Sequence, residues 1–446
     1  MPTKVNSLQN KSSPQTTVNA TLWIVVAATL PIYRLIATDF SARLPYALIA
    51  LVVVCALLGQ VRIPSNPALW ILALLTISMA AVISGTSTSI VASSYVGLKL
   101  AVFIGLTPFV LRYFIVTDIN FLRRALTAFV AVQSLSATAG LVQLTGVQIL
   151  GRDANSGRAN GLAVHPNVLG VMCTLAILIC IGALAKRSGR DRFILWGLVG
   201  LNAAALVGTG SLSSMLAAGM GVCVLLLCMR VTAKAAMLIA SGVTIAYFAL
   251  TVFGYDTTVL TGTVEDRVNT VTGVSEDGVA SLSIRQATYD FAWKYIESDP
   301  WVGVGMNSTN EGTFDGKTVV HNYLLHGWYQ GGILLFAVFA AVTVAMTLLI
   351  LRCIATGSNP VAAATITAML TFAATSAFYD QQQYWLPILV AVAAIGPSRE
   401  VNGSPDKQQL HPVDKHRALY GQPISPPTPP PNANGNRLSR VQEIPA

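Results

Sequence analysis

Residues 319–335 read VVHNYLLHGWYQGGILL, and this stretch marks the point where a long polar segment returns to an apolar one. The polar segment spans residues 254–320 and holds ten of the nineteen carboxylates in the chain. Elsewhere the connections between apolar runs are short. One long polar excursion in an otherwise apolar chain predicts that the chemistry faces one side of a membrane.

The composition places the chain among membrane proteins. Its 446 residues are 53% hydrophobic and 11% charged, with a mean hydropathy of +0.61, whereas soluble domains carry roughly 25% charged residues. The net charge of +9 comes from short connections and a tail, where cations set topology and meet anionic lipid head groups. We therefore expect contact with membrane lipids and none with nucleic acid. The six cysteines have no CxxC spacing and predict neither a metal site nor a disulfide.

Apolar runs of bilayer-spanning length predict an all-α polytopic membrane protein with about twelve transmembrane helices. The runs begin near Leu22, Leu44, Ala68, Ser94, Ala125, Asn167, Phe193, Leu212, Ala235, Tyr323, Val361 and Trp385. The predicted segments are an N-terminal stretch at 1–20, helices 1–9 within 21–253, a large loop with short helices at 254–320, helices 10–12 within 321–396, and a tail at 397–446.

The basic residues predict the orientation of the chain. Twelve spans place both termini on one side, and nineteen of the 28 lysines and arginines lie on that side, against seven on the other. By the positive-inside rule both termini are cytoplasmic and the large loop is extracytoplasmic, as in a multi-pass protein of the inner or plasma membrane. The proline-rich tail is expected to be disordered, either as a solvated tail or as a docking segment for a cytoplasmic partner.

Two residues of the large loop are candidates for chemistry. His321 lies where the loop meets the membrane, and it is either an interfacial histidine or a base held there by a helix that Asn322 can cap. The apolar spacing over residues 284–295 predicts an amphipathic helix with Arg285 in its first turn. Arg285 is either a solvated arginine or a residue whose guanidinium binds phosphate oxygens through two hydrogen bonds.

A second extracytoplasmic loop reads GRDANSGRANGLAVHPN over residues 151–167. It supplies Arg152, Arg158 and His165 before a helix that should open at Pro166. A glycine-rich loop that carries arginines beside a helix N-terminus is either an anion site or a flexible turn.

Arg34 and Lys99 lie inside apolar runs. A charge at mid-bilayer costs about 2.5–3.5 kcal/mol, so such residues usually face the interior of the helix bundle and pair there. Lys99 is also close enough to the outer surface to snorkel. No paired carboxylates occupy the apolar runs, and the chain has no Walker A, HExxH or DxD motif. We therefore expect neither a metal nor a cofactor.

Four segments resemble the O-antigen ligase and polymerase family. Two of them follow each other in the large loop and the helix after it: DPWVGVGMNS at 299–308 and HNYLLHGWYQGGILL at 321–335. GRANGLAVHPNVLG at 157–170 is similar to the loop before the family's middle helices. LVGTGSLSSMLAAGMGV at 206–222 is similar to its segment two spans before the large loop. The resemblance covers roughly residues 152–335, and the order of the motifs makes it more specific than any one of them.

The resemblance implies a membrane-embedded glycosyltransferase of C type. Members of this family use a polyprenyl-diphosphate-linked glycan donor on the extracytoplasmic face, and they transfer the glycan to a lipid- or glycan-borne hydroxyl with inversion and without a metal. His321 then matches the essential histidine at the loop end, and Arg285 and Arg158 match functional arginines. These implied roles make His321 and Arg285 catalytic, with Asn322 and His165 in support.

One position departs from the family pattern. Many members have an arginine after the serine that corresponds to Ser211, whereas this chain has Leu212. The remaining candidates for contact with the donor diphosphate are Arg158, Arg267, Lys99 and Arg152.

Two other functions stay open at this point. A lipid-linked-glycan transporter or flippase would move its substrate without making a bond, and discontinuous helices with charges at the bilayer midplane would favour it. A sensor or assembly protein would use the large loop only for binding. The polar residues gather outside the membrane, which favours the enzyme. The sequence does not decide between ligase and polymerase, nor does it identify the glycan and the acceptor.

Overall fold

The computed structural model of this protein is built from helices. The residues that it describes are 14–41, 43–185, 187–231, 264, 268–269, 280–307, 319–376, 378 and 381–397. Within these ranges there is no strand, only two isolated β-bridges in the loop before residue 165. The all-α prediction is therefore confirmed for the described part of the chain.

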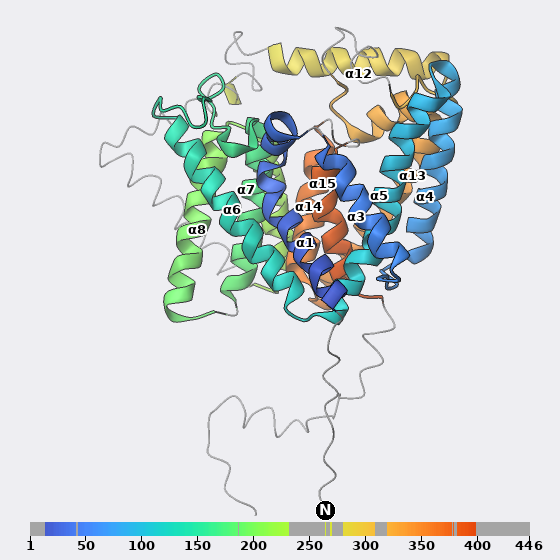
Figure 1. The fold of residues 1–446 in the computed structure, drawn as a ribbon. Coiled ribbons are helices and arrows are strands. Elements are labelled where there is room, and N and C mark those ends of the chain that lie inside the picture. Colours follow the sequence, from blue (N-terminus) through green and yellow to red (C-terminus); the bar gives the residue numbers. More distant parts are fainter. Residues whose placement is uncertain are drawn as a thin grey trace, which may run out of the picture. The chain divides into compact units, whose positions relative to one another are not determined.

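The main helices follow one another as a bundle (Figure 1). They are α1 (Pro14–Thr29), α3 (Leu44–Leu57), α4 (Pro67–Ser84), α5 (Ile90–Thr117), α6 (Phe121–Gln143), α7 (Pro166–Leu184), α8 (Gly189–Gly208), α9 (Leu212–Cys228), α12 (Ala280–Ser298), α13 (Tyr323–Thr356), α14 (Pro360–Ala373) and α15 (Gln382–Ala394). Short elements extend or join them: η1 (Leu30–Ile32), α2 (Tyr33–Leu35), η2 (Ile36–Phe40), η3 (Gly85–Ser87) and η4 (Gly161–Ala163).

These helices coincide with eleven of the twelve apolar runs predicted from the sequence. The twelfth, which begins near Ala235, lies outside the described residues, as do Arg267, residues 1–13 and the tail from 398. Seven helical segments are long and apolar enough to cross a membrane, and three shorter apolar helices accompany them. The protein is thus a multi-pass membrane protein, while the total of twelve spans stays a prediction.

Proline residues account for several helix boundaries. Pro45, Pro67, Pro166 and Pro360 occupy the first turns of α3, α4, α7 and α14, where the missing N–H would have no partner in any case. Pro31 falls inside the first span instead. There the α-helix gives way to the 3₁₀ turn η1, the short α2 and the π-turn η2, because proline cannot continue the regular ladder of hydrogen bonds.

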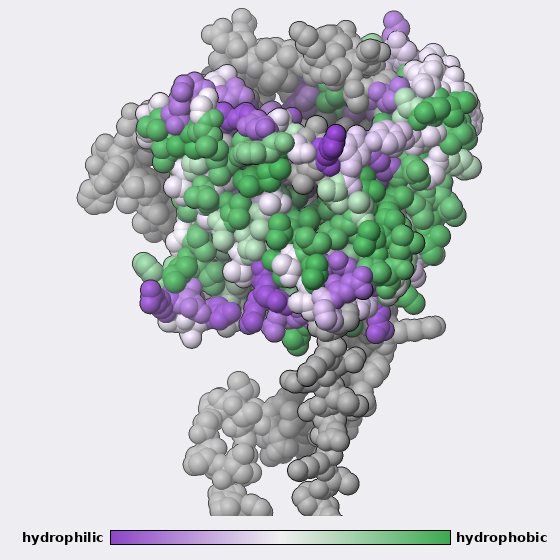
Figure 2. All heavy atoms as spheres, viewed as in Figure 1, coloured by the Kyte–Doolittle hydropathy of each residue, from purple (hydrophilic) through white to green (hydrophobic). Residues whose placement is uncertain are grey.

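One large core holds the bundle together, and the outside of the bundle is apolar. Trp23, Trp70, Phe103 and Trp385 are among the largest fully buried side chains. Figure 2 shows a band of hydrophobic side chains between two hydrophilic ends. On α4 that band includes exposed residues such as Leu75, which is 63% exposed. A broad exposed apolar surface of this kind fits lipid rather than water.

The loop between α6 and α7 and the helix α12 lie at the same end of the bundle, at the top of Figure 1. The connection between α7 and α8, which carries Arg187, lies at the opposite end. The two loops assigned to one side by the topology prediction therefore do share one end of the molecule. Which compartment that end faces stays a prediction.

A break in α13 decides how the polar segment joins the bundle. Gly332 has φ 66° and ψ −168°, which interrupts the helix ten residues into it. The break leaves the carbonyls of Tyr329 and Gln330 to accept hydrogen bonds from the backbone N–H groups of Val304 at 3.0 Å and Gly305 at 2.9 Å. The DPWVGVG motif thus supplies the donors that a continuous helix would have supplied itself.

The turn between α4 and α5 fixes the other side of this motif. Ser87 Oγ donates to the carbonyl of Gly303 at 2.8 Å, and Ser93 Oγ accepts from the N–H of Met306 at 3.1 Å. A side chain on Gly303 would collide with the backbone of Gly332, 2.5 Å from its nitrogen. The segment is therefore held between two helices and requires glycine at its closest approach.

The break yields a prediction for the stability of the fold. Replacing Gly332 by alanine places a Cβ 2.2 Å from the carbonyl oxygen of Trp301 and demands a positive φ from a residue that disfavours it. We expect Gly332→Ala to destabilise the protein by roughly 1–3 kcal/mol, seen as a lower midpoint of thermal unfolding in detergent.

The matched control is Gly219→Ala on α9, because a Cβ there meets nothing within 4 Å and alanine favours a helix. It should leave the midpoint unchanged or raise it. Equal midpoints for the two variants would contradict the role assigned to the break.

Candidate active site

The backbone around His321 is held on both sides by hydrogen bonds. Tyr289 Oη on α12 donates to the carbonyl of His321 at 2.9 Å. Asn322 caps α13 as expected, because its Oδ1 accepts from the N–H groups of Leu324 at 3.1 Å and Leu325 at 3.0 Å. Its Nδ2 donates to the carbonyl of Ala374 at 3.2 Å. The histidine therefore stands at a rigid junction rather than on a loose loop.

The environment of His321 favours a neutral imidazole. Its pKa is lowered from the usual value, first by burial and then by the charge of Arg285, while a hydrogen bond to the backbone of Val319 acts in the opposite direction. Nδ1 is buried and has no hydrogen-bond partner within the described part of the chain. A neutral imidazole with an uncommitted nitrogen can accept a proton.

Arg285 reaches this junction because α12 packs across the start of α13. Ala292, Ile296, Val320 and Tyr329 form a small buried cluster between them. The helix begins at Ala280, so Arg285 lies in its second turn, not in the first turn as the sequence predicted. The error reflects helical residues before Ile284, where the apolar periodicity gives no signal.

The loop before α7 is attached to the turn between α8 and α9 through Arg158. Its Nε donates to the carbonyl of Thr209 at 2.7 Å, and one terminal nitrogen donates to Asn167 Oδ1 at 3.0 Å. The N–H of Ala159 also donates to the carbonyl of Gly208 at 2.8 Å. Arg158 therefore connects two segments that lie about 50 residues apart, in addition to any role in binding an anion.

His165 occupies the N-cap of α7, which opens at Pro166 as predicted. Its Nδ1 accepts from the N–H of Asn167 at 3.2 Å. Burial first, and then the charges of Arg34, Arg158 and His321 in that order, together lower the pKa of His165 to about 4. The imidazole is thus neutral at neutral pH, as the capping bond requires.

These effects link five groups, because His165 feels the charges of Arg34, Arg158 and His321, while His321 feels that of Arg285. We call them the cationic cluster, and its members are Arg34, Arg158, His165, Arg285 and His321. The structure therefore brings the candidates from the two outer loops together. Arg34 was recognised in the sequence only as a charge inside a span. The available signal was its place three residues after Pro31, where the helix is irregular.

Two other predicted diphosphate ligands have different neighbours. Arg152 forms an ion pair with Asp39, with its terminal nitrogen 2.7 Å and 2.9 Å from the two carboxylate oxygens. Lys99 Nζ lies 4.4 Å from the ring centre of Tyr95 and 5.1 Å from that of Tyr46. Their charges are thus already stabilised by a carboxylate and by aromatic rings. Arg267 lies outside the described residues.

The apolar helices and the cationic cluster define a multi-pass membrane protein with a polar site at one end of its bundle. A family model described as O-antigen ligase matches residues 197–340. In this part the chain is similar to the O-antigen ligase family, and the match confirms the resemblance seen in the sequence. It includes Arg285 and His321, while the loop at 151–167 lies outside it. A comparison with curated proteins found no significant match. The family match and the membrane-spanning helices together support a membrane glycosyltransferase-like function.

The contacts of Arg158 yield a prediction that separates structure from catalysis. Arg158→Ala removes two hydrogen bonds from a charged, half-buried group, each worth about 1.5–3 kcal/mol. We expect a clearly lower midpoint of thermal unfolding, together with loss of function. Arg285→Ala should change the midpoint little, because no hydrogen bond of its guanidinium is found among the described residues. If Arg158→Ala kept the wild-type midpoint, its connecting role would be wrong.

Proposed function

We propose that this protein transfers or polymerises a polyprenyl-diphosphate-linked glycan onto a lipid- or glycan-borne hydroxyl on the extracytoplasmic face of the membrane. The observation that supports this most is a half-buried imidazole at His321, held at the start of α13, whose pKa is lowered by burial and by the nearby charge of Arg285. The two sit at the end of the bundle where a membrane-anchored donor and a glycan would meet. The family match to O-antigen ligase supports the same reaction class.

The proposed step needs a base and positive charge. The acceptor hydroxyl oxygen attacks the anomeric carbon of the donor sugar, and the bond from that carbon to the diphosphate oxygen breaks with its electron pair leaving on the diphosphate. The hydroxyl proton passes to His321. Arg285 stabilises the departing diphosphate through charge-assisted hydrogen bonds. Because diphosphate is already a good leaving group, this route requires no metal.

The other candidate ligands take secondary places in this proposal. Arg158 contributes positive charge and the shape of the loop that faces the diphosphate. His165 keeps the N-terminus of α7 in position. Arg152 is already paired with Asp39 and Lys99 lies over aromatic rings, and Arg267 stays a candidate from the sequence.

A transporter is the second candidate, because two helices are discontinuous. The first span changes its helical type beside Arg34, and α13 is broken at Gly332. Interrupted helices with a charge are a feature of transporters. The break at Gly332 lies near one end of α13, however, and the carbonyls that it leaves accept hydrogen bonds from Val304 and Gly305. The break therefore positions the candidate active site at the end of the bundle and does not form a substrate site at the middle of the membrane.

Substitution of the two catalytic candidates tests the reaction. We expect His321→Ala to lower the rate of glycan transfer by about 10²–10⁴ and Arg285→Ala by about 10²–10³. The assay uses purified protein in vesicles with a defined polyprenyl-diphosphate-linked donor and acceptor. Lys294→Ala is the matched control, since it removes an exposed cation from the same helix.

Correctly folded His321→Ala or Arg285→Ala protein with full activity would overturn these assignments. Movement of the donor across the membrane with no covalent product from the wild type would favour the transporter. The length of the product separates the two enzymes: single transfers of a finished chain indicate a ligase, and stepwise growth indicates a polymerase.

The pH dependence follows from the lowered pKa of His321. The base must be neutral, and its folded-state pKa lies below the usual 6.5. The value of kcat/KM, which reports the groups of the donor-free enzyme, should therefore be flat through neutral pH and fall only when the pH drops through that lowered value. A rate that declines from pH 7.5 towards 6.5 would show that the group titrates like an ordinary exposed histidine.

A further inference from the structure

Two apolar cavities adjoin each other in the bundle. The first, of about 280 Å³, lies between α1, α3 and the start of α15, with Tyr33 of α2 also on its wall. The second, of about 330 Å³, lies between α1, α5, α6, α7, α14 and α15. Leu30 and Leu386 line both of them. These two leucines therefore mark the place where the two cavities meet.

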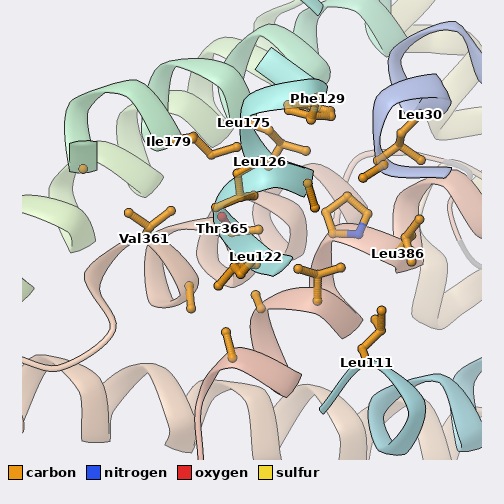
Figure 3. Close-up of a pocket in the computed structure, with 18 of the residues that line it drawn as sticks. Leu30, Leu111, Leu122, Leu126, Phe129, Leu175, Ile179, Val361, Thr365 and Leu386 are labelled. Atoms are coloured by element: carbon orange, nitrogen blue, oxygen red, sulfur yellow. The ribbon is translucent and has the colours of Figure 1, made fainter. Parts of the chain in front are cut away.

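The second cavity is lined almost wholly by hydrocarbon. Figure 3 shows Leu30, Leu126, Leu175 and Leu386 around it, from four different elements, with Thr365 as a polar side chain. Such a space suits a hydrocarbon chain and would not hold an ordered row of waters, because waters need polar partners.

The first cavity is close to the bilayer. Leu22 and Val25 of α1 line it and are also 45% and 50% exposed on the surface of the bundle. A chain can therefore reach it sideways from the membrane. No passage through the polar end of the protein is needed.

The depth of the second cavity decides what length of chain would fill it. On α7 it is lined by Leu175, Ile179 and Gly182. Gly182 lies sixteen residues after Pro166, or about 24 Å along the helix from the cationic cluster. An acyl chain of the outer leaflet covers only half of a hydrocarbon core of about 30 Å. A hydrocarbon chain whose head group is bound at the cationic cluster must therefore be longer than an ordinary acyl chain to reach Gly182.

A charge stands at the other end of this path. Arg34 follows Tyr33, which lines the first cavity, and α2 packs against η4 in the loop that leads to His165. Within the described part of the chain no carboxylate forms an ion pair with Arg34. An arginine in an apolar span is costly when it has no counter-charge, so an anionic group of a ligand would supply one.

We propose that the two cavities form one track for the isoprenoid chain of the lipid-linked donor, with Arg34 as a contact for its phosphate groups. The proposal rests on the proposed function for the identity of the donor. The chain enters between α1 and α3, passes Leu30 and Leu386, and ends against α6, α7 and α14. The track thereby sets the depth at which the diphosphate stops, beside Arg158 and His165.

Photo-crosslinking to the unaltered protein tests the track without any need for transfer. The probe is a long-chain polyprenyl diphosphate with a diazirine at the far end of the chain. We expect labelled peptides from α6, α7, α14 or α15, with labelling suppressed by excess unlabelled polyprenyl diphosphate and not by phospholipid. Labels on the lipid-facing residues of α4, such as Leu72 and Leu75, or suppression by phospholipid, would overturn the proposal.

A filled cavity gives an independent measurement. Leu126→Trp narrows the second cavity, and Leu135→Trp adds the same ring to an exposed position of the same helix. We expect Leu126→Trp to raise KM for a long-chain donor at least about tenfold, the loss expected when roughly two buried CH₂ groups are displaced. KM for a donor with two isoprene units should stay unchanged, and Leu135→Trp should change neither.

The track would be overturned if Leu126→Trp changed KM equally for the long-chain and the short-chain donor and if, in addition, the crosslinks to the unaltered protein lay outside the two cavities. For the phosphate contact, Arg34→Leu should weaken binding of long-chain polyprenyl diphosphate about tenfold, and Arg43→Leu, at an exposed cation beyond the same span, should not. If crosslinks map to the track while no glycan is transferred, the proposed function fails and the lipid site stands.

Discussion

The hydrogen bonds between the backbone of residues 303–305 and the broken turn of α13 are the constraint on which the site depends. In a hydrocarbon environment, unsatisfied backbone groups cost several kcal/mol each, so a helix can break only where other donors replace its own. Val304 and Gly305 provide them for Tyr329 and Gln330. Because α12 ends just before this segment, the same bonds also fix where α12 lies across the start of α13.

This arrangement explains how a histidine and an arginine 36 residues apart come near each other. α12 is a rigid helix whose C-terminal end is attached at residues 303–305 and whose middle is packed through Ala292 and Ile296. Tyr289, one turn after Arg285, bonds the carbonyl of His321. A helix that meets the histidine at one point and the broken turn at another fixes the backbone position of Arg285, from which its side chain can reach a group bound at the proposed site.

Much of this could be predicted from local signals, and some could not. The start of α7 at Pro166 and the cap at Asn322 follow from short-range preferences for proline and asparagine, and α12 follows from its apolar spacing. The break at Gly332 could not be predicted, because QGG inside a long apolar run is compatible with a continuous helix. Only the tertiary contact with the backbone of residues 303–305 shows that the helix is broken there. Arg158 was read as an anion ligand, and its bonds to Thr209 and Asn167 depend on a tertiary approach that no local pattern encodes. For the same reason Arg34 was seen as a charge inside a span, and its proximity to His165 emerged only from the packing of α2 against η4.

The charge of Arg285 near His321 has a consequence for the order of events in the proposed mechanism. With the site empty, Arg285 and burial hold the pKa of His321 low, which keeps the imidazole neutral but makes it a weak base. A bound diphosphate brings negative charge next to Arg285 and offsets its effect on the histidine. The pKa of His321 then rises, so the base strengthens only when the donor is in place. The same negative charge that Arg285 must stabilise as the leaving group therefore also prepares His321 to take the proton, and the two catalytic tasks are coupled through one electrostatic field.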